Sequence, residues 1–298
     1  MNDLLAVEPN ALRDSFELRY LLDKVGPYVG RYVTKLPSDW ERNFCDYCDS
    51  LPAPDSLLCK ELFRKYKAAF IPARKSWIKG RPWTENVQTL IKEGERFVGV
   101  IAAPDAPGPF NTLREFDWDA VPDSKDRDVR STAKNLADAA SVLIRNNSRI
   151  ILVDPYFQPQ KRKCSSVIRA FCSVGKGGRF ARMDLVVRET VLCEKQRLTD
   201  VVKDAQSLLS AAEAPSMGIW LFPVDDSLSQ RRMHERYLVA ESGALEFGYG
   251  FQEFYDGTSS RLSVVGREFH QLLLELYYDE GHDFTRPAGV PPGGIRLV

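Results

Sequence analysis

Residues 232–251 read RMHERYLVAESGALEFGYGF, and they decide which fold we expect for the surrounding chain. The run 237–240 is typical of a β-strand, and Ser242-Gly243 supplies turn residues. Residues 244–249 then alternate small, apolar and polar side chains, as a second strand does. The pattern predicts a β-hairpin.

The same stretch carries the most informative chemistry of the chain. His234 and Arg236 are two residues apart, so on an extended strand both side chains leave the same face. Glu241 adds a carboxylate, while Gly248 and Gly250 leave backbone open to a ligand. An imidazole can attack or protonate a phosphoryl group, and a guanidinium neutralises its oxygens. We predict a phosphate site with these residues in catalytic or binding roles; a satisfied structural histidine is the simpler alternative.

The spacing of these residues resembles the signature of the phospholipase D superfamily, in which His-x-Lys-x4-Asp is followed six residues later by Gly-Ser-x-Asn. Here Arg236 replaces the lysine, Glu241 replaces the aspartate, and Gly248-Tyr249-Gly250-Phe251 replaces Gly-Ser-x-Asn. In its His-x-Arg and Gly-x-Gly the pattern is similar to the phospholipase-D-like C-terminal domain of eukaryotic MIT-domain proteins. That likeness implies recognition of membrane phosphoinositides rather than cleavage.

A second shared feature is Asp154-Pro155-Tyr156, which follows an expected strand at 149–153. It matches the Asp-Pro-Tyr that ends an early strand in those domains. The resemblance covers roughly residues 129–280, and it makes Asp154 and Tyr156 supporting residues of the site.

Basic residues also precede the motif. Arg231 and Arg232 increase the local positive potential, and we expect Arg232 to help bind phosphate, with solvated loop arginines as the equal alternative. The remaining histidines have simpler interpretations. His270 lies among apolar residues of an expected helix and is interpreted as a packing histidine, whereas His282 lies in a polar tail.

The composition is that of a soluble globular protein with no overall attraction to anions. Among the 298 residues, Lys plus Arg equals Asp plus Glu at 41 each, so any anion binding must be local. No apolar run reaches the length of a membrane span and no leader sequence is evident, so a cytoplasmic location is expected. Cys45, Cys48 and Cys59 lack a nearby fourth ligand, and six cysteines fit a reducing compartment. We expect no cofactor and no metal.

Two regions are expected along the chain. Residues 1–128 are predicted to be mainly helical, with one strand at 97–103 and a Pro-rich linker at 104–128. The predicted helices of this region cover residues 12–25, 38–48, 56–70 and 84–93.

Residues 129–298 alternate between helical and strand patterns, which predicts an α/β domain with a mixed sheet, helices on both faces and a flexible C-terminal tail. The resemblance implies that this domain is phospholipase D-like. Its predicted helices cover residues 130–145, 165–173, 194–212 and 264–278, and strands are predicted at 149–154, 183–188 and 218–224, besides the hairpin.

Two functions from different classes follow from the resemblance. In the first, the pocket recognises a phosphate or phosphodiester, on nucleic acid more than on lipid, with weak or partner-dependent catalysis and a partner protein at the N-terminal region. In the second, the protein is a homodimeric, metal-independent phosphodiesterase or nuclease that uses His234 from each subunit, as in single-motif bacterial nucleases of defence systems. Arg236 in place of lysine favours binding. A scaffolding role is a third possibility.

Overall fold

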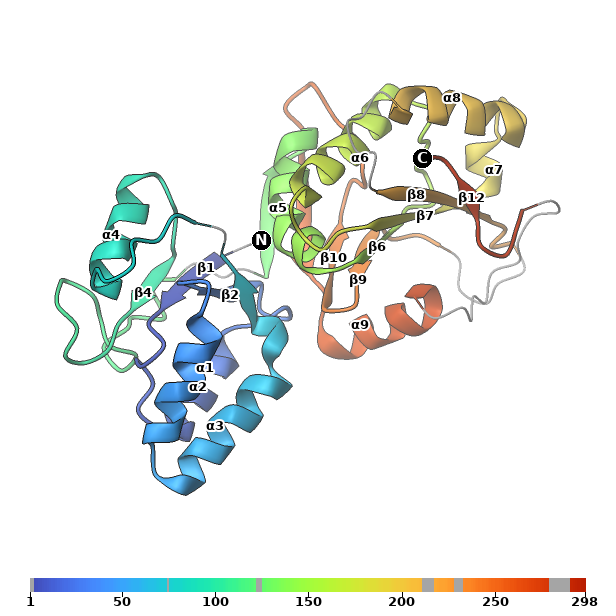
Figure 1. Ribbon diagram of the computed structural model, residues 1–298. Coiled ribbons are helices and arrows are strands. Elements are labelled where there is room, and N and C mark those ends of the chain that lie inside the picture. The colour runs from blue at the N-terminus through green and yellow to red at the C-terminus, as the bar shows by residue number, and fades with distance from the viewer. Residues whose placement is uncertain (1–2, 74, 122–124, 211–216, 228–232, 279–289) are drawn as a thin grey trace. The chain divides into compact units, whose positions relative to one another are not determined.

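In the computed structural model the chain divides into two compact units, residues 2–125 and 126–298. The structure describes residues 3–73, 75–121, 125–210, 217–227, 233–278 and 290–298. Each unit has its own β-sheet (Figure 1), which confirms the α/β fold class. The division lies close to the boundary predicted at residue 128.

The N-terminal unit is built on a parallel sheet of four strands in the order β3-β2-β1-β4. The strands are β1 (Asp3–Val7), β2 (Arg31–Lys35), β3 (Phe70–Pro72) and β4 (Gly99–Ile101). The helices are α1 (Ser15–Lys24), α2 (Trp40–Ser50), α3 (Ala53–Lys65) and α4 (Trp83–Lys92), with a short 3-10 turn, η1 (Lys67–Ala69).

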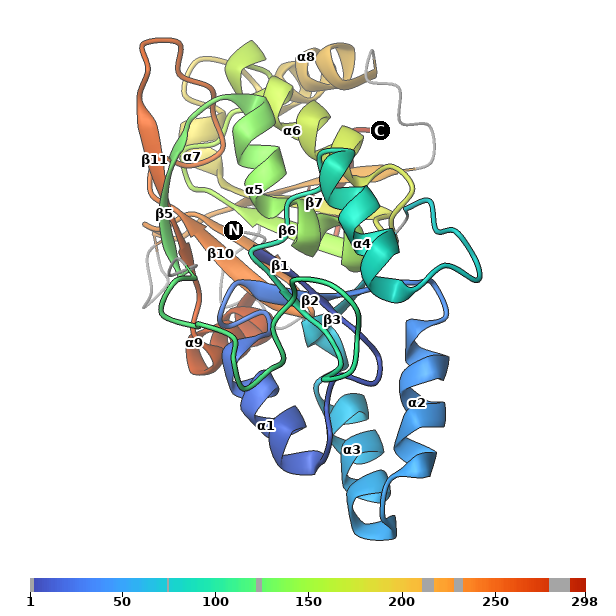
Figure 2. The ribbon, with the colours of Figure 1, turned by 90° about the vertical axis from the view of Figure 1, so that its left-hand side faces the viewer.

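Successive side chains of β1 pack into two different hydrophobic cores, one on each face of the sheet. Leu5 and Val7 pack with buried residues of α1, α2 and α3, whereas Ala6 packs with Trp83 and Val87 of α4. Helices therefore cover both faces of the sheet, and Figure 2 shows α4 on the opposite side of the strands from the other three.

The prediction of a mainly helical N-terminal region needs a correction. All four predicted helices are present and hold most of the regular structure, but they surround a parallel sheet of which only the strand near residues 97–103 was predicted. The missed strands β1, β2 and β3 are only three to five residues long. Strands buried on both faces lack the alternation that marks a half-exposed strand.

The C-terminal unit contains a mixed sheet of eight strands in the order β12-β8-β7-β6-β9-β10-β11-β5. Its strands are β5 (Asp126–Arg130), β6 (Arg149–Val153), β7 (Arg182–Arg188), β8 (Gly218–Val224), β9 (Tyr237–Ala240), β10 (Gly243–Phe247), β11 (Ser259–Val264) and β12 (Ile295–Arg296). Its helices are α5 (Ala133–Asn146), α6 (Arg162–Gly175), α7 (Glu189–Leu192), α8 (Leu198–Ser210), α9 (Arg267–Leu273) and the π-helical η2 (Leu274–Tyr278).

The three central strands β6, β7 and β8 are parallel, and β9 runs antiparallel beside β6. One face of the sheet packs on α5, α6 and α8, and the other packs on α9 and η2 (Figure 1). The predicted mixed sheet with helices on both faces is confirmed, as is the hairpin, which is formed by β9 and β10.

Two expectations for this unit are corrected. The end of the expected linker is a strand, because residues 126–130 form β5 and pair with β11. The tail that was predicted to be flexible ends in β12, which pairs with β8, and Leu297 is buried in the main core. The apolar side chains of residues 295 and 297 favour packing of this tail on the sheet. The prediction of flexibility considered only its many prolines and glycines.

No helix in the described part of the chain is both long enough and apolar enough to span a bilayer.

His270 on α9 is the packing histidine that the sequence predicts. It is 1% exposed, and its Nε2 lies 2.8 Å from the carbonyl oxygen of Ala240 on β9. Burial lowers the pKa of His270, and the hydrogen bond to Ala240 opposes this only in part. His282 lies outside the described residues.

This burial predicts acid-sensitive stability. Below about pH 6.5, the usual pKa of histidine, the unfolded chain takes up a proton that the folded chain resists, so the free energy of unfolding decreases as pH falls. His270 should contribute at most ~1.4 kcal/mol per pH unit, the limit for one proton. His270→Gln retains a donor for Ala240, and urea denaturation between pH 7.5 and 5.5 should show a smaller loss for this variant than for the wild type. Equal losses would contradict this assignment.

Candidate functional site

Polar residues converge where the parallel strands of the C-terminal unit end. Asp154 follows β6, Arg188 ends β7, and Asp226 lies two residues beyond β8. Because β9 is antiparallel and Tyr237 pairs with Val153, the segment that precedes β9 reaches the same edge. That segment contains Arg236. Open α/β sheets commonly bind ligands beyond the carboxyl ends of their parallel strands.

Asp154 is the buried centre of this group, with 4% of its surface exposed. Its Oδ1 accepts a hydrogen bond from the backbone N–H of Tyr156 at 2.9 Å, and its Oδ2 accepts one from Phe251 at 3.2 Å. Burial raises the pKa of Asp154, and the two backbone hydrogen bonds and the charge of Arg236 only partly offset this. The carboxylate therefore joins the end of β6 to the turn that follows β10.

Arg236 lies beside Asp154 without forming a close ion pair. Its Nε is 4.0 Å from Asp154 Oδ1, its Nη1 donates to the carbonyl oxygen of Gly248 at 3.1 Å, and its guanidinium carbon is 5.0 Å from the ring centre of Tyr156. No other acceptor among the described residues takes a hydrogen bond from this guanidinium, and a quarter of the side chain is exposed. It retains N–H donors for an anion.

The prediction of the site missed Arg188 and Asp226. Arg188 donates from Nε and Nη2 to the two carboxylate oxygens of Asp226, at 2.9 and 2.7 Å, and from Nη2 to the carbonyl oxygen of Met233 at 2.6 Å. Burial opposes the ionisation of Asp226, but the hydrogen bonds from Arg188 and from the backbone of Met233 outweigh it, so its pKa is lowered.

Tyr156 lies near both arginines. The guanidinium carbon of Arg188 is 5.6 Å from its ring centre, compared with 5.0 Å for Arg236, and 47% of the tyrosine is exposed. Both distances are within the range of cation–π attraction. Arg188 could have been predicted as a site residue, because it is a charged residue at the carboxyl end of a predicted strand.

His234 lies one residue beyond Met233, which Arg188 and Asp226 hold in place. Its side chain is exposed, and no hydrogen bond joins it to another described residue. Both His234 and Arg236 precede β9, so the expectation that strand geometry directs them to one face does not apply. Arg231 and Arg232 lie outside the described residues.

The structure does not bring Glu241 to this cluster. Tyr237 pairs with Val153 at one end of β9 and Ala240 pairs with Ile150 at the other, so Glu241 lies at the turn beyond the far end. Glu241 is five residue steps along the chain from Arg236, which corresponds to roughly 16 Å in an extended strand. Its proposed place in the catalytic group is therefore corrected.

The two glycines have a different role from the one predicted. Gly250 has φ of +76°, and a Cβ at this position would overlap Oδ2 of Asp154. At Gly248 a Cβ would lie 3.3 Å from the carbonyl oxygen of Arg261. Glycine at these two positions allows the chain to pack closely on itself. This packing explains the glycines without a ligand.

A metal centre is not apparent among the residues that the structure describes, where no three His, Cys, Asp or Glu side chains are grouped as ligands. Cys48 of α2 and Cys59 of α3 are both buried in the N-terminal core.

Comparisons with known proteins identify no family for this chain. No protein-family model matches the chain, and no curated protein matches it significantly. One solved structure that aligns is TrmBL2, described as an archaeal chromatin protein that shows a novel mode of DNA binding. The alignment covers 85% of this chain and 71% of that protein at 11% sequence identity, with a TM-score of 0.31.

The packing at Gly250 yields a stability prediction. Alanine in a left-handed conformation costs about 1–2 kcal/mol, and Gly250→Ala should lose an additional ~1–3 kcal/mol because its methyl group overlaps the Asp154 carboxylate. Gly257→Ala is the matched control, since Gly257 has φ of +86° but its Cβ would meet only an Arg130 nitrogen at 3.8 Å. Chemical denaturation measures both losses. Equal losses would show that the Asp154 contact does not constrain residue 250.

Proposed function

We propose that this chain is a phospholipase D-like protein that recognises a phosphodiester group of a nucleic acid, with weak or partner-dependent catalysis. The single observation that carries the proposal is the state of Arg236. Its guanidinium is partly exposed, lies 4.0 Å from its nearest carboxylate and retains donors that no described residue accepts. A phosphodiester oxygen pair matches such a planar fork.

The two arginines of the cluster are not equally available to an anion. Arg188 is neutralised by a bidentate ion pair with Asp226, whose pKa is lowered. Among the described residues, the carboxylate within ion-pair range of Arg236 is that of Asp154, which lies 4.0 Å away and has a raised pKa. Among the described residues of this group, Arg236 therefore provides most of the uncompensated positive charge, and Arg188 and Arg236 both lie within cation–π distance of Tyr156.

Tyr156 favours a nucleic acid as the source of the phosphodiester. Nearly half of this residue is exposed beside Arg236, so a base can stack on its ring while the guanidinium holds the adjoining phosphate. Stacking on an aromatic side chain contributes about 1–3 kcal/mol per base.

Binding to a labelled single-stranded oligonucleotide at low salt tests the proposal. Arg236→Ala should weaken binding by roughly 10- to 150-fold, the equivalent of a charge-assisted hydrogen bond of about 1.5–3 kcal/mol. The matched control is Arg179→Ala. This substitution removes the same charge, but Arg179 is exposed near the opposite end of β7. Equal weakening by the two variants, or no binding by the wild type, would contradict the proposal.

Catalysis by a homodimer is the second candidate, because exposed His234 lies next to the cluster. A nucleophilic histidine is usually oriented by another group, and no described residue hydrogen-bonds this one. We therefore expect little cleavage of single- or double-stranded DNA in EDTA by the wild type. Robust cleavage by a dimer that disappears in His234→Ala would replace the binding proposal with a nuclease.

A further inference from the structure

The N-terminal unit contains a small pocket between α1 and the segment that follows β4. It encloses about 270 Å³ and is lined by Phe16, Glu17, Tyr20, Leu113 and Arg114. Sites for whole small molecules usually enclose about 300–1,000 Å³. The size of this pocket is better matched to one or two side chains of a peptide.

The walls of the pocket are apolar and unusually exposed. Phe16 is 75% exposed and Tyr20 is 42% exposed, and both lie on one face of α1 because they are four residues apart. Leu113 is 2% exposed. Burial of apolar surface contributes a free energy of about 25 cal/mol per Å², so covering these aromatic side chains favours binding of a partner.

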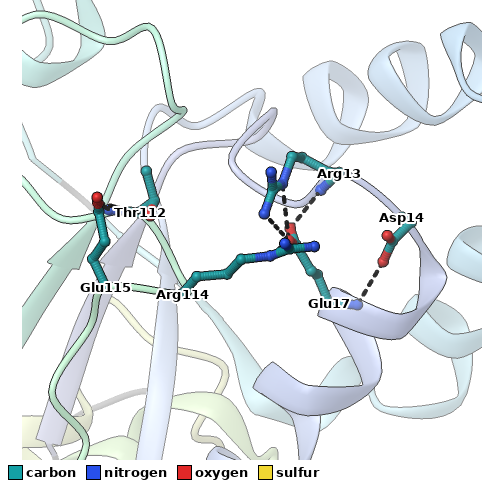
Figure 3. A network of polar contacts seen from close by, with 6 residues as sticks. All are labelled: Arg13, Asp14, Glu17, Thr112, Arg114 and Glu115. Carbon is teal, nitrogen blue, oxygen red and sulfur yellow. Dashed lines mark hydrogen bonds and ion pairs between the residues drawn. The ribbon is translucent and has the colours of Figure 1, made fainter.

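The polar end of the pocket holds one carboxylate between two guanidiniums (Figure 3). Oε1 of Glu17 accepts hydrogen bonds from Arg13 Nη2 at 2.6 Å and from Arg114 Nε at 2.8 Å. Burial opposes the ionisation of Glu17, but these hydrogen bonds outweigh it and lower its pKa. Glu17 contacts both guanidiniums, whereas Asp14 and Glu115 nearby accept hydrogen bonds from the backbone of α1 and of the turn at Thr112, so no described carboxylate pairs with the outer edge of Arg114.

Local hydrogen bonds preorganise both sides of the pocket. Asp14 caps α1 by accepting the backbone N–H of Glu17 at 2.8 Å. Glu115 accepts both the backbone N–H and the hydroxyl of Thr112, which closes the turn that carries Leu113 and Arg114 (Figure 3). A preformed site loses less conformational entropy when it binds.

Arg114 gives the pocket its preference for negative charge. Its side chain is 64% exposed, and only its Nε is used within the described part of the chain, in the bond to Glu17. Both Nη groups remain as donors, and a guanidinium edge of this kind pairs with a carboxylate.

We infer that this pocket docks a short segment of a partner protein in which an apolar side chain is adjacent to an Asp or Glu. The apolar side chain enters between Phe16, Tyr20 and Leu113, and the carboxylate pairs with Arg114. All of the lining residues belong to the unit of residues 2–125, so the inference does not depend on the phosphodiester site.

An array of decapeptides probed with the full chain tests the inference. Each peptide has a central Leu, Phe or Trp followed by Asp, Glu, Asn, Gln or Lys. Peptides with Asp or Glu should bind about 10-fold or more tightly than their Asn, Gln and Lys versions, as measured by fluorescence anisotropy of the best pairs. No preference for the acidic peptides would overturn the inference.

Variants locate the binding. Phe16→Ala and Arg114→Gln should each weaken the best acidic peptide by about 10-fold, the effect of losing one well-packed contact. Leu57→Ala and Arg42→Gln are matched controls, because these side chains are 71% and 70% exposed on other helices of the same unit. Arg114→Lys keeps the charge without the fork and should lie between Arg114→Gln and the wild type.

Two results would assign the pocket differently and overturn the inference. Equal weakening by the variants and their controls would place the peptide elsewhere. A dimer that forms with concentration and is lost in Phe16→Ala would make a second copy of this chain the occupant.

Discussion

The group of polar residues at the sheet edge of the C-terminal unit (Asp154, Tyr156, Arg188, Asp226 and Arg236) depends on the burial of one carboxylate. A buried carboxylate is tolerated only when hydrogen-bond donors surround it, and Asp154 obtains two of them from the backbone of residues 156 and 251. Satisfying it from residue 251 brings the turn after β10 so close that no side chain fits at residue 250. The same turn presents the carbonyl oxygen of Gly248 to Arg236. One buried group thus positions a glycine, a turn and an arginine.

Two arginines at the same sheet edge have different roles because their carboxylates differ. Asp226 contacts Arg188 through both oxygens and holds Met233 as well, so this pair organises the segment that precedes β9. The oxygens of Asp154 are hydrogen-bonded to the backbone of residues 156 and 251, and Arg236 remains at ion-pair range without a bidentate contact. Electrostatic attraction to a ligand is strongest where the protein itself has not compensated the charge.

Local patterns predicted five of the eight strands of the C-terminal sheet, namely β6, β7, β8 and the hairpin strands β9 and β10, whereas β5, β11 and β12 were missed. The hairpin was evident from a short apolar run and Ser242-Gly243, and the structure places Asp154, Tyr156 and Arg236 near one another. The strand pairing that carries Glu241 to the far edge, and Arg188 and Asp226 to the near one, depends on contacts between distant residues. Short strands such as β1 and β12 form because neighbouring strands pair with them, which no local pattern encodes.

Glu17 and Asp154 show how the surroundings of a carboxylate set its role. Both are almost completely buried, yet the pKa of Glu17 is lowered and that of Asp154 is raised. Glu17 receives hydrogen bonds from two guanidiniums, whereas Asp154 receives them from two neutral amides with one arginine at longer range. Charged donors stabilise a buried anion more strongly than neutral ones, and desolvation is stronger at Asp154, so the hydrogen bonds outweigh desolvation at Glu17 but not at Asp154. In both units an arginine next to the carboxylate retains N–H donors that no described residue accepts.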